Sequence, residues 1–319
     1  MISRRRLLAA GAWSLLPASA LLGGCGGPSP GRLRVAAGDE GGIYFAFARL
    51  LAARLEERVD GLRVEVQTTG GTVDNYGRLA RGEADIGLGL ADSVVATAGA
   101  GADGDGVRAL ARTYENYLQL VVAADGPVRR IGDLAGRDVT LGAAGSGAAV
   151  TGDVLLRAAG LATSGPGGVR VRHAGLALSL ELLERGVTEA VLWSGGIPTP
   201  AISEFDARYP VRMLDLGALV PQMATVSGYP YVARRVPHVR YAPSDRAPTT
   251  VGVPNFLLAR PGLDSETAQT VVEVLAEDAA RLLPDFVLGL QYLSPGSMIQ
   301  TTPVRLHPGA VAAYRRLHG

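Results

Sequence analysis

The feature that most constrains the fold is a junction that recurs along the chain: a short apolar run, a glycine-rich turn and then a helical pattern of apolar residues. Such turns lie at residues 38–42, 68–72, 142–147 and 194–198. Strands that alternate with helices form parallel sheets, and the turns then lie at the carboxyl ends of the strands. The chain is therefore predicted to adopt an α/β fold.

The glycine turns fall into two groups, near residues 38–92 and near residues 142–198. This grouping predicts two lobes that face each other across a cleft. Apolar runs at 107–113 and 118–124 predict two strands between the groups, and the long run at 249–259 predicts a second crossover between the lobes. The expected division is residues 32–116 and 250–319 for lobe I, and residues 117–249 for lobe II.

The turns have a chemical use as well as a structural one. A helix that begins after a glycine turn exposes unpaired backbone N–H groups and a partial positive charge, and glycine lets an anion approach closely. Carboxylates and phosphates fit such places. Thr72 and Ser146 each add a hydroxyl donor, and the rings of Tyr44 and Trp193 can wall a small ligand. The alternative is that the glycines only allow tight turns and close packing, and that Trp193 is only packed.

Composition excludes several classes of enzyme. All 31 basic residues are arginines, because the chain contains no lysine, so Schiff-base enzymes and the P-loop lysine are excluded. The net charge of +1 gives no overall field that would attract nucleic acid. One cysteine cannot form a disulfide framework, and the four histidines show no metal-ligand spacing. We expect no metal and no cofactor.

Some alternatives stay open. Residues 99–104 match the pattern GxGxxG, but the expected helix precedes this turn instead of following it, so a dinucleotide site is rejected there. The 142–147 turn has the correct strand-to-helix context but different glycine spacing, which leaves a nucleotide site as a weak alternative. An enzyme acting on a small carboxylate would recruit Glu83, Asp85 or Asp92 as general base. No nucleophile and base pair accompanies them, which favours a binding protein.

The first residues predict export and anchoring. A cationic start at Ser3-Arg4-Arg5-Arg6 and an uncharged apolar stretch predict a signal peptide over residues 1–24, with an order similar to a twin-arginine signal. Leu22-Gly23-Gly24-Cys25 resembles the bacterial lipobox, so Cys25 is the expected lipidation site; the alternative is an accidental cysteine near a cleavage site. Residues 25–31 then form the lipidated N-terminus and a flexible tether.

Several segments, in the same order and spacing from about residue 33 onward, together resemble the TAXI family of extracytoplasmic solute-binding proteins, which serve TRAP transporters. The matching segments are Gly41-Gly42-Ile43-Tyr44-Phe45, Thr69-Gly70-Gly71-Thr72-Val73-Asp74-Asn75, Gly82-Glu83-Ala84-Asp85-Ile86-Gly87 with Ala91-Asp92, Gly145-Ser146-Gly147, Gly195-Gly196-Ile197-Pro198-Thr199-Pro200-Ala201, Pro248-Thr249-Thr250-Val251-Gly252-Val253-Pro254 and His307-Pro308-Gly309-Ala310.

The resemblance implies a two-lobed periplasmic-binding-protein fold of type II-like organisation, with a ligand cleft between lobes joined by crossover strands. It implies a monomer that captures a small carboxylate or an amino acid, such as glutamate, and delivers it to a TRAP-type membrane permease. An ABC-type permease or a sensor is the alternative partner. The implied ligand-binding residues are Gly42, Tyr44, Gly71, Thr72, Gly145, Ser146, Gly147, Trp193, Gly195 and Gly196.

The chain departs from the family pattern at the first turn. Where family members commonly have Thr-Gly-Gly-Thr, this chain has Ala37-Gly38-Asp39-Glu40, and where Gln often precedes Ala-Asp, it has Leu90. We hypothesise that Asp39 or Glu40 contacts a cationic group of the ligand, such as an amino-acid ammonium. The alternative is a pair of exposed acids in a turn.

Overall fold

The computed structural model describes residues 31–98, 106–236, 241, 247–282, 284 and 293–318. The predicted signal peptide, Cys25, the tether up to residue 30, the 99–104 turn and His238 lie outside the described residues. Within the described ranges, no helix combines the length and the apolar character that a membrane span requires.

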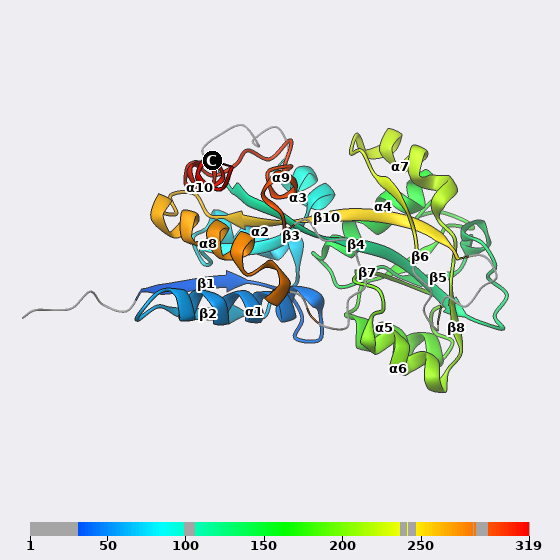
Figure 1. Cartoon of the computed structure of the whole chain (residues 1–319). Coiled ribbons are helices and arrows are strands. Elements are labelled where there is room, and N and C mark those ends of the chain that lie inside the picture. Colours follow the sequence, from blue (N-terminus) through cyan, green and yellow to red (C-terminus); the bar gives the residue numbers. More distant parts are fainter. Residues whose placement is uncertain are drawn as a thin grey trace, which may run out of the picture.

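One ten-stranded sheet runs through both halves of the molecule in the order β2-β1-β3-β10-β4-β7-β5-β6, with β8 paired to β4 and β9 to β10 (Figure 1). The strands are β1 (Arg32–Ala36), β2 (Arg63–Gln67), β3 (Ile86–Leu90), β4 (Arg108–Ala123), β5 (Asp138–Thr140), β6 (Arg170–Arg172), β7 (Ala190–Gly195), β8 (Val211–Met213), β9 (Val232–Arg235) and β10 (Thr249–Ala259). The helices are α1 (Ile43–Arg58), α2 (Thr72–Ala80), α3 (Ala91–Ala98), α4 (Gly147–Ala158), α5 (Leu176–Glu184), α6 (Pro200–Arg208), α7 (Val220–Ser227), α8 (Ser265–Glu277), α9 (Pro295–Met298) and α10 (Pro308–Leu317).

Two long strands, β4 and β10, join the halves. The first half of β4 pairs antiparallel with β10, and its second half pairs with β7, where Tyr117 lies opposite Gly195. The end of β10 pairs with β3 and its beginning pairs with β9. The prediction of two separate strands at 107–113 and 118–124 is therefore wrong, because one continuous strand spans both apolar runs. The prediction of a second crossover near Val251 is confirmed, while the lobe limits at 116/117 and 249/250 stay a prediction.

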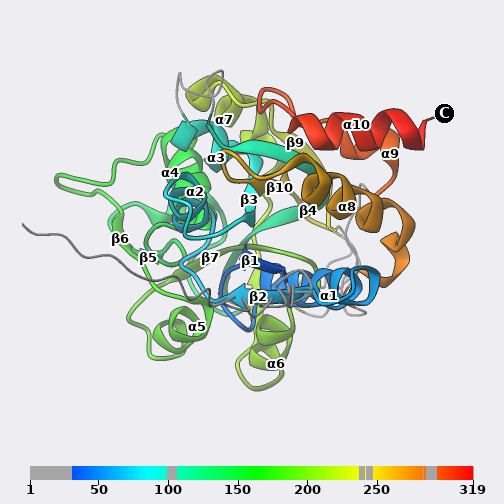
Figure 2. The same cartoon turned by 90° about the vertical axis from the view of Figure 1, so that its left-hand side faces the viewer.

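Helices cover both faces of the sheet in each half (Figures 1 and 2). In the first half, α1, α8 and α10 bury Phe47, Leu275 and Tyr314 against β1 and β3. On the other face, α2 and α3 bury Leu79 and Val94 against β10. In the second half, α4 and α7 cover one face and α5 and α6 the other. Burial on both faces explains why β3, most of β10 and the end of β4 are largely apolar.

The buried imidazole of His307 caps helix α10. Its Nδ1 accepts a hydrogen bond from the Gly309 N–H at 3.1 Å, so the proton lies on Nε2, which donates to the Leu263 carbonyl at 3.0 Å. Burial lowers the pKa of His307 below its ordinary value of 6.5. A proton on Nδ1 would remove the cap, so the folded state disfavours the charged ring.

Because the folded-state pKa of His307 is lowered, its contribution to stability is complete above pH 6.5 and is lost as pH falls. We expect the free energy of unfolding to decrease between pH 7.5 and pH 5.5, by at most about 1.4 kcal/mol per pH unit for one proton. Denaturant titrations at both pH values measure this change. His307→Asn keeps a capping side chain that does not titrate, and an equal pH dependence in this variant would contradict the assignment.

Candidate functional site

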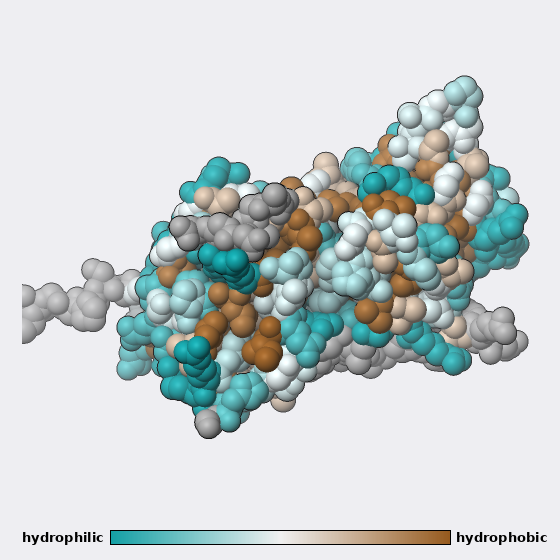
Figure 3. Space-filling view, turned by 90° about the horizontal axis from the view of Figure 1, so that it is seen from above, coloured by the Kyte–Doolittle hydropathy of each residue, from teal (hydrophilic) through white to brown (hydrophobic). Residues whose placement is uncertain are grey.

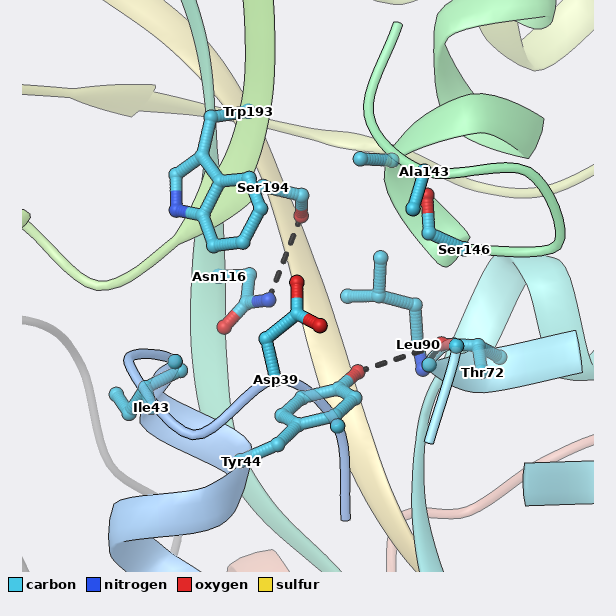
Figure 4. Close-up of a pocket in the computed structure, with 16 residues that line it drawn as sticks. Asp39, Ile43, Tyr44, Thr72, Leu90, Asn116, Ala143, Ser146, Trp193 and Ser194 are labelled. Carbon is cyan, nitrogen blue, oxygen red and sulfur yellow. Dashed lines mark hydrogen bonds between the residues drawn. The ribbon is translucent and has the colours of Figure 1, made fainter. Parts of the chain in front are cut away.

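A small cavity lies between the two halves, beside the crossover strands (Figure 4). Its volume is about 70 Å³. Three helices point their N-termini at it: α1 and α2 from the first half and α4 from the second. The lining residues are Gly38, Asp39, Gly42, Ile43, Tyr44, Gly70, Gly71, Thr72, Leu90, Asn116, Ala143, Ser146, Gly147, Ala148, Trp193 and Ser194.

The α1 junction contributes a turn and a phenol. The Gly42 N–H donates to the Asp39 carbonyl at 2.9 Å, which closes the turn before the helix begins at Ile43. Tyr44, one residue further, donates its hydroxyl proton to Asn255 Oδ1 at 2.5 Å. Burial raises the pKa of Tyr44. The phenol is therefore neutral and held in place at the base of the cavity.

At the α2 junction, the side chain of Thr72 hydrogen-bonds to another part of the protein. Gly71 has φ of 100°, a left-handed conformation that favours glycine, and this turn directs Thr72 toward β3. Thr72 Oγ1 accepts a hydrogen bond from the Leu90 N–H at 3.1 Å and lies 3.5 Å from the Tyr44 hydroxyl. Thr72 therefore reaches the cavity as predicted, but its oxygen also ties α2 to the end of β3.

The α4 junction packs directly against the α2 junction. Ser146 caps α4 by accepting a hydrogen bond from the Ala149 N–H at 3.2 Å, and its hydroxyl proton stays available as a donor. A Cβ atom on Gly147 would lie 2.5 Å from Leu90 Cδ1, and one on Gly71 would lie 3.4 Å from Ser146 Cα. The glycines therefore let the two halves meet, which is the packing role that the sequence left as an alternative.

Three predicted site residues lie outside this cavity. Gly145 does not line it; its carbonyl accepts a hydrogen bond from the Val73 N–H at 3.1 Å and so links the two junctions. Gly195 and Gly196 line a neighbouring cavity of about 10 Å³ next to Trp193. A Cβ atom on Gly195 would lie 2.5 Å from Trp193 Nε1, so this glycine makes room for the indole that walls the main cavity.

Polar side chains on the crossover strands form the floor, and sequence reasoning missed them. Asn255 on β10 donates to Asn116 Oδ1 on β4 at 3.0 Å, and Asn116 Nδ2 lies 3.4 Å from Ser194 Oγ on β7. Together with Tyr44 they make a hydrogen-bonded row from α1 to the second half. Isolated asparagines in long apolar strands are the signal that could have identified this row.

Asp39 supplies the charge of the cavity. Figure 4 shows its carboxylate directed into the space between Tyr44, Leu90 and Ser194. Glu40 does not line the cavity; it is exposed, and it accepts a hydrogen bond from Thr68 Oγ1 at 3.4 Å. Among the described residues, no arginine or histidine lines the cavity. The site therefore combines one carboxylate with the positive ends of three helices.

The acids considered for an enzyme have other partners and do not line the cavity. Glu83 pairs with Arg81 at 2.8 Å on the surface. Asp85 accepts hydrogen bonds from the Nε atoms of Arg34 and Arg260, at 3.0 and 2.8 Å. Asp92 is buried in contact with the second half. Over the described part of the chain, no group of three His, Cys, Asp or Glu residues could hold a metal ion.

Comparison with solved structures shows the fold. XAC2383 from Xanthomonas citri bound to ATP is 14% identical over 90% of this chain and 95% of that chain, with a TM-score of 0.51. A structure from work on glutathione import via GshT and the cystine ABC importer TcyBC of Streptococcus mutans is 14% identical over 80% of this chain and 98% of that chain, with a TM-score of 0.50. Tv2483 bound to L-arginine is 13% identical over 82% of this chain and 93% of that chain, with a TM-score of 0.50.

These likenesses confirm the predicted two-lobed periplasmic-binding-protein fold. The family is shown by a separate match to the sequence. The model of the NMT1-like family matches residues 35–316, which is nearly all of the chain that the structure describes. This chain belongs to the NMT1-like family.

Proposed function

We propose that the protein is an extracytoplasmic solute-binding protein that captures a small carboxylate or an amino acid and delivers it to a TRAP-type membrane permease. The observation that carries the proposal is the cavity between the halves, where the N-termini of three helices face one carboxylate. The NMT1-like family match and the two-lobed fold support a binding protein of the periplasmic type. The bound molecule is called the cargo below.

The cavity suits a molecule that carries both charges. Helix N-termini leave first-turn N–H groups without acceptors in their own helix, and those of Ile43 on α1 and Gly147 on α4 are available to a cargo carboxylate. Asp39 would receive an ammonium group, and Tyr44 and Trp193 would enclose the carbon skeleton. The proposed contacts are Gly42, Tyr44, Gly71, Thr72, Ser146, Gly147, Trp193 and Asp39; a role in binding for Gly145, Gly195 and Gly196, which do not line this cavity, stays a prediction.

Capture would proceed by closure of the halves. Bending of β4 and β10, the strands that join them, would separate the α2 and α4 junctions and open the cavity. The cargo favours closure because it contacts both halves only in the closed form, and this difference in affinity is the driving force. Because we propose that no bond of the cargo is made or broken, incubation with the protein should return it unchanged.

The proposal predicts a fluorescence signal from one residue. The chain has two tryptophans, Trp13 and Trp193, and Trp13 lies in the predicted signal peptide, so the mature protein would carry only Trp193. Because the half-buried indole of Trp193 walls the cavity, cargo binding should change its emission in a saturable way. Titration of amino acids and small carboxylates measures this change. A complete panel that leaves the emission unchanged, together with no small molecule released on denaturation, would contradict the proposal.

The cargo itself is best identified directly. Denaturation of the purified protein followed by mass spectrometry of the released small molecules identifies a cargo that has stayed bound through purification. A compound with a carboxylate and an ammonium group is the expected result. A dicarboxylate without an ammonium would retain the binding function but exclude the role of Asp39.

Two kinds of permease are candidates for the partner: a TRAP-type and an ABC-type permease. The resemblance to the TAXI family favours a TRAP-type permease, whereas one similar structure comes from work on a cystine ABC importer. Figure 3 shows hydrophobic side chains on the upper face of both halves. Ile299, directly after α9, and Val226 on α7 are among the exposed large hydrophobic residues. Such side chains suit contact with a permease in the closed form. Uptake that requires ATP in membrane vesicles would favour the ABC-type partner.

We also propose that the protein is exported and held by a lipid on Cys25 at the outer face of the cytoplasmic membrane. The lipobox resemblance at Leu22-Gly23-Gly24-Cys25 supports this location. Cys25→Ser should release the protein from the membrane fraction. Fractionation of cells that express the full chain measures the change, and membrane association that survives the substitution would contradict lipid anchoring.

A further inference from the structure

A buried carboxylate lies where the two halves meet, outside the cavity. Asp92, the second residue of α3, is only 4% exposed. Its Oδ1 accepts hydrogen bonds from the Ser93 N–H at 2.6 Å and the Ser93 hydroxyl at 3.1 Å. Its Oδ2 accepts from the hydroxyls of Thr151 at 2.7 Å and Tyr231 at 2.8 Å.

The donors come from both halves of the molecule. Ser93 lies on α3 with Asp92, in the first half, whereas Thr151 lies on α4 and Tyr231 lies just before β9, in the second half. Burial of a carboxylate costs free energy unless hydrogen bonds compensate it, and burial raises the pKa of Asp92. Both described donors to Asp92 Oδ2, the hydroxyls of Thr151 and Tyr231, come from the second half. These two hydrogen bonds can therefore form only while the halves are together.

The same cluster reaches the wall of the cavity. The Thr151 hydroxyl lies 2.9 Å from the Gly147 carbonyl as well as 2.7 Å from Asp92, and the Ser93 hydroxyl lies 3.4 Å from the same carbonyl. Gly147 begins α4 and lines the cavity. The position of the α4 N-terminus is thus coupled to the partners of Asp92.

We propose that Asp92 is a positioning residue that latches the closed form, by accepting hydrogen bonds from Thr151 and Tyr231 that only the closed arrangement of the halves can supply. In the open form, water replaces these two donors. Loss of either hydroxyl leaves the carboxylate under-satisfied in the closed form alone, so it shifts the equilibrium toward the open form. This inference rests on the proposed function only in that it assumes the closing motion.

The test measures the separation of the halves without any cargo. Spin labels are placed on the full chain with Cys25→Ser, at Ala53→Cys on α1 and Leu178→Cys on α5, two exposed positions in different halves. Pulsed electron resonance then gives the distance distribution. We expect a mainly closed population in this labelled parent, and a fall of about 10- to 100-fold in the closed-to-open ratio in Thr151→Val and in Tyr231→Phe, the range for a lost hydrogen bond to a charged group.

A matched control lies on the same helix. Thr97 donates its hydroxyl proton to the Ser93 carbonyl at 2.7 Å, so this hydrogen bond lies within α3 and does not join the halves. Thr97→Val should therefore leave the distance distribution unchanged. Equal shifts of the distance distribution in Thr97→Val and Thr151→Val would mean that both substitutions act through the stability of their helices, and this result would overturn the proposal.

A rescue experiment separates the latch from a purely structural role. Asp92→Asn removes the charge whose burial requires the donors, so adding it to Tyr231→Phe should restore part of the closed population. A double variant that is more open than Tyr231→Phe overturns the proposal, as does a mainly open labelled parent. The Trp193 titration tests cargo binding independently, so failure of the latch and failure of the proposed function give different results.

Discussion

Substitution of Gly147 by alanine should reduce cargo affinity by about 10- to 100-fold, as expected for overpacking that costs about 1–3 kcal/mol. The new Cβ would lie 2.5 Å from Leu90 Cδ1 and 2.8 Å from Thr72 Oγ1 when the halves are together. Leu90 is buried and cannot move away at low cost. In the proposed open form these atoms would move apart, so the substitution would act against closure. Titration of the Trp193 emission measures the affinity.

The free energy of unfolding of Gly147→Ala should rise slightly or stay unchanged, although its affinity for the cargo falls. In a helix interior alanine is a better helix former than glycine by about 1 kcal/mol, and at the first residue of α4, where Gly147 lies, only part of this gain applies. Gly41→Ala is the matched control in the turn before α1, because a Cβ atom there meets no atom within 4 Å and Gly41 lines the neighbouring small cavity instead of the main one. An affinity in Gly147→Ala equal to that of Gly41→Ala would show that the α2 and α4 junctions need not meet.

The second large effect concerns Asp39, whose carboxylate is directed into the cavity. Asp39→Asn should weaken binding of amino acids by about 10- to 100-fold, the range for a lost charge-assisted hydrogen bond of about 1.5–3 kcal/mol. It should leave unchanged, or strengthen, the binding of carboxylates without an ammonium group, because it removes a like charge from the site. Titration of matched pairs, such as an amino acid and its deaminated analogue, measures the difference.

Glu40→Gln provides the control for Asp39→Asn. The two acids are adjacent in the chain and carry the same charge, but only Asp39 lines the cavity. An effect of equal size in both variants would indicate a general electrostatic influence instead of a contact. If the double variant binds the cargo with unchanged affinity, Asp39 has no role in recognition.

Much of this arrangement could be predicted from the sequence because glycine turns mark strand ends. The turns at 38–42, 68–72 and 142–147 do meet at one cavity, because β10 and β4 pair antiparallel between the halves, so the carboxyl ends of the parallel strands in each half face the other half. The choice between Asp39 and Glu40 could not be predicted. Adjacent turn residues point in different directions, and only the fold determines which one faces the second half.

Other features depend on contacts between residues far apart in the chain. Asn116 lies at the point where the sequence suggested a break between two strands, yet its backbone pairs opposite Val253 of β10 and β4 continues through it, while its side chain bonds to Asn255. A polar residue in an apolar run resembles a turn until its partner is known. Similarly, the sequence alone offers Asp92 as a candidate catalytic base, because its partners Thr151 and Tyr231 are 59 and 139 residues away.

The path of the chain through β4 and β10 has a consequence for synthesis. The second half is built from one uninterrupted stretch, whereas the first half needs α8 and α10, which follow β10 at the end of the chain. During translation the later-made half can therefore complete its core first, and the N-terminal strands and helices must wait for the last residues to emerge. Removal of α10 by a premature stop codon should accordingly leave the earliest part of the polypeptide unassembled.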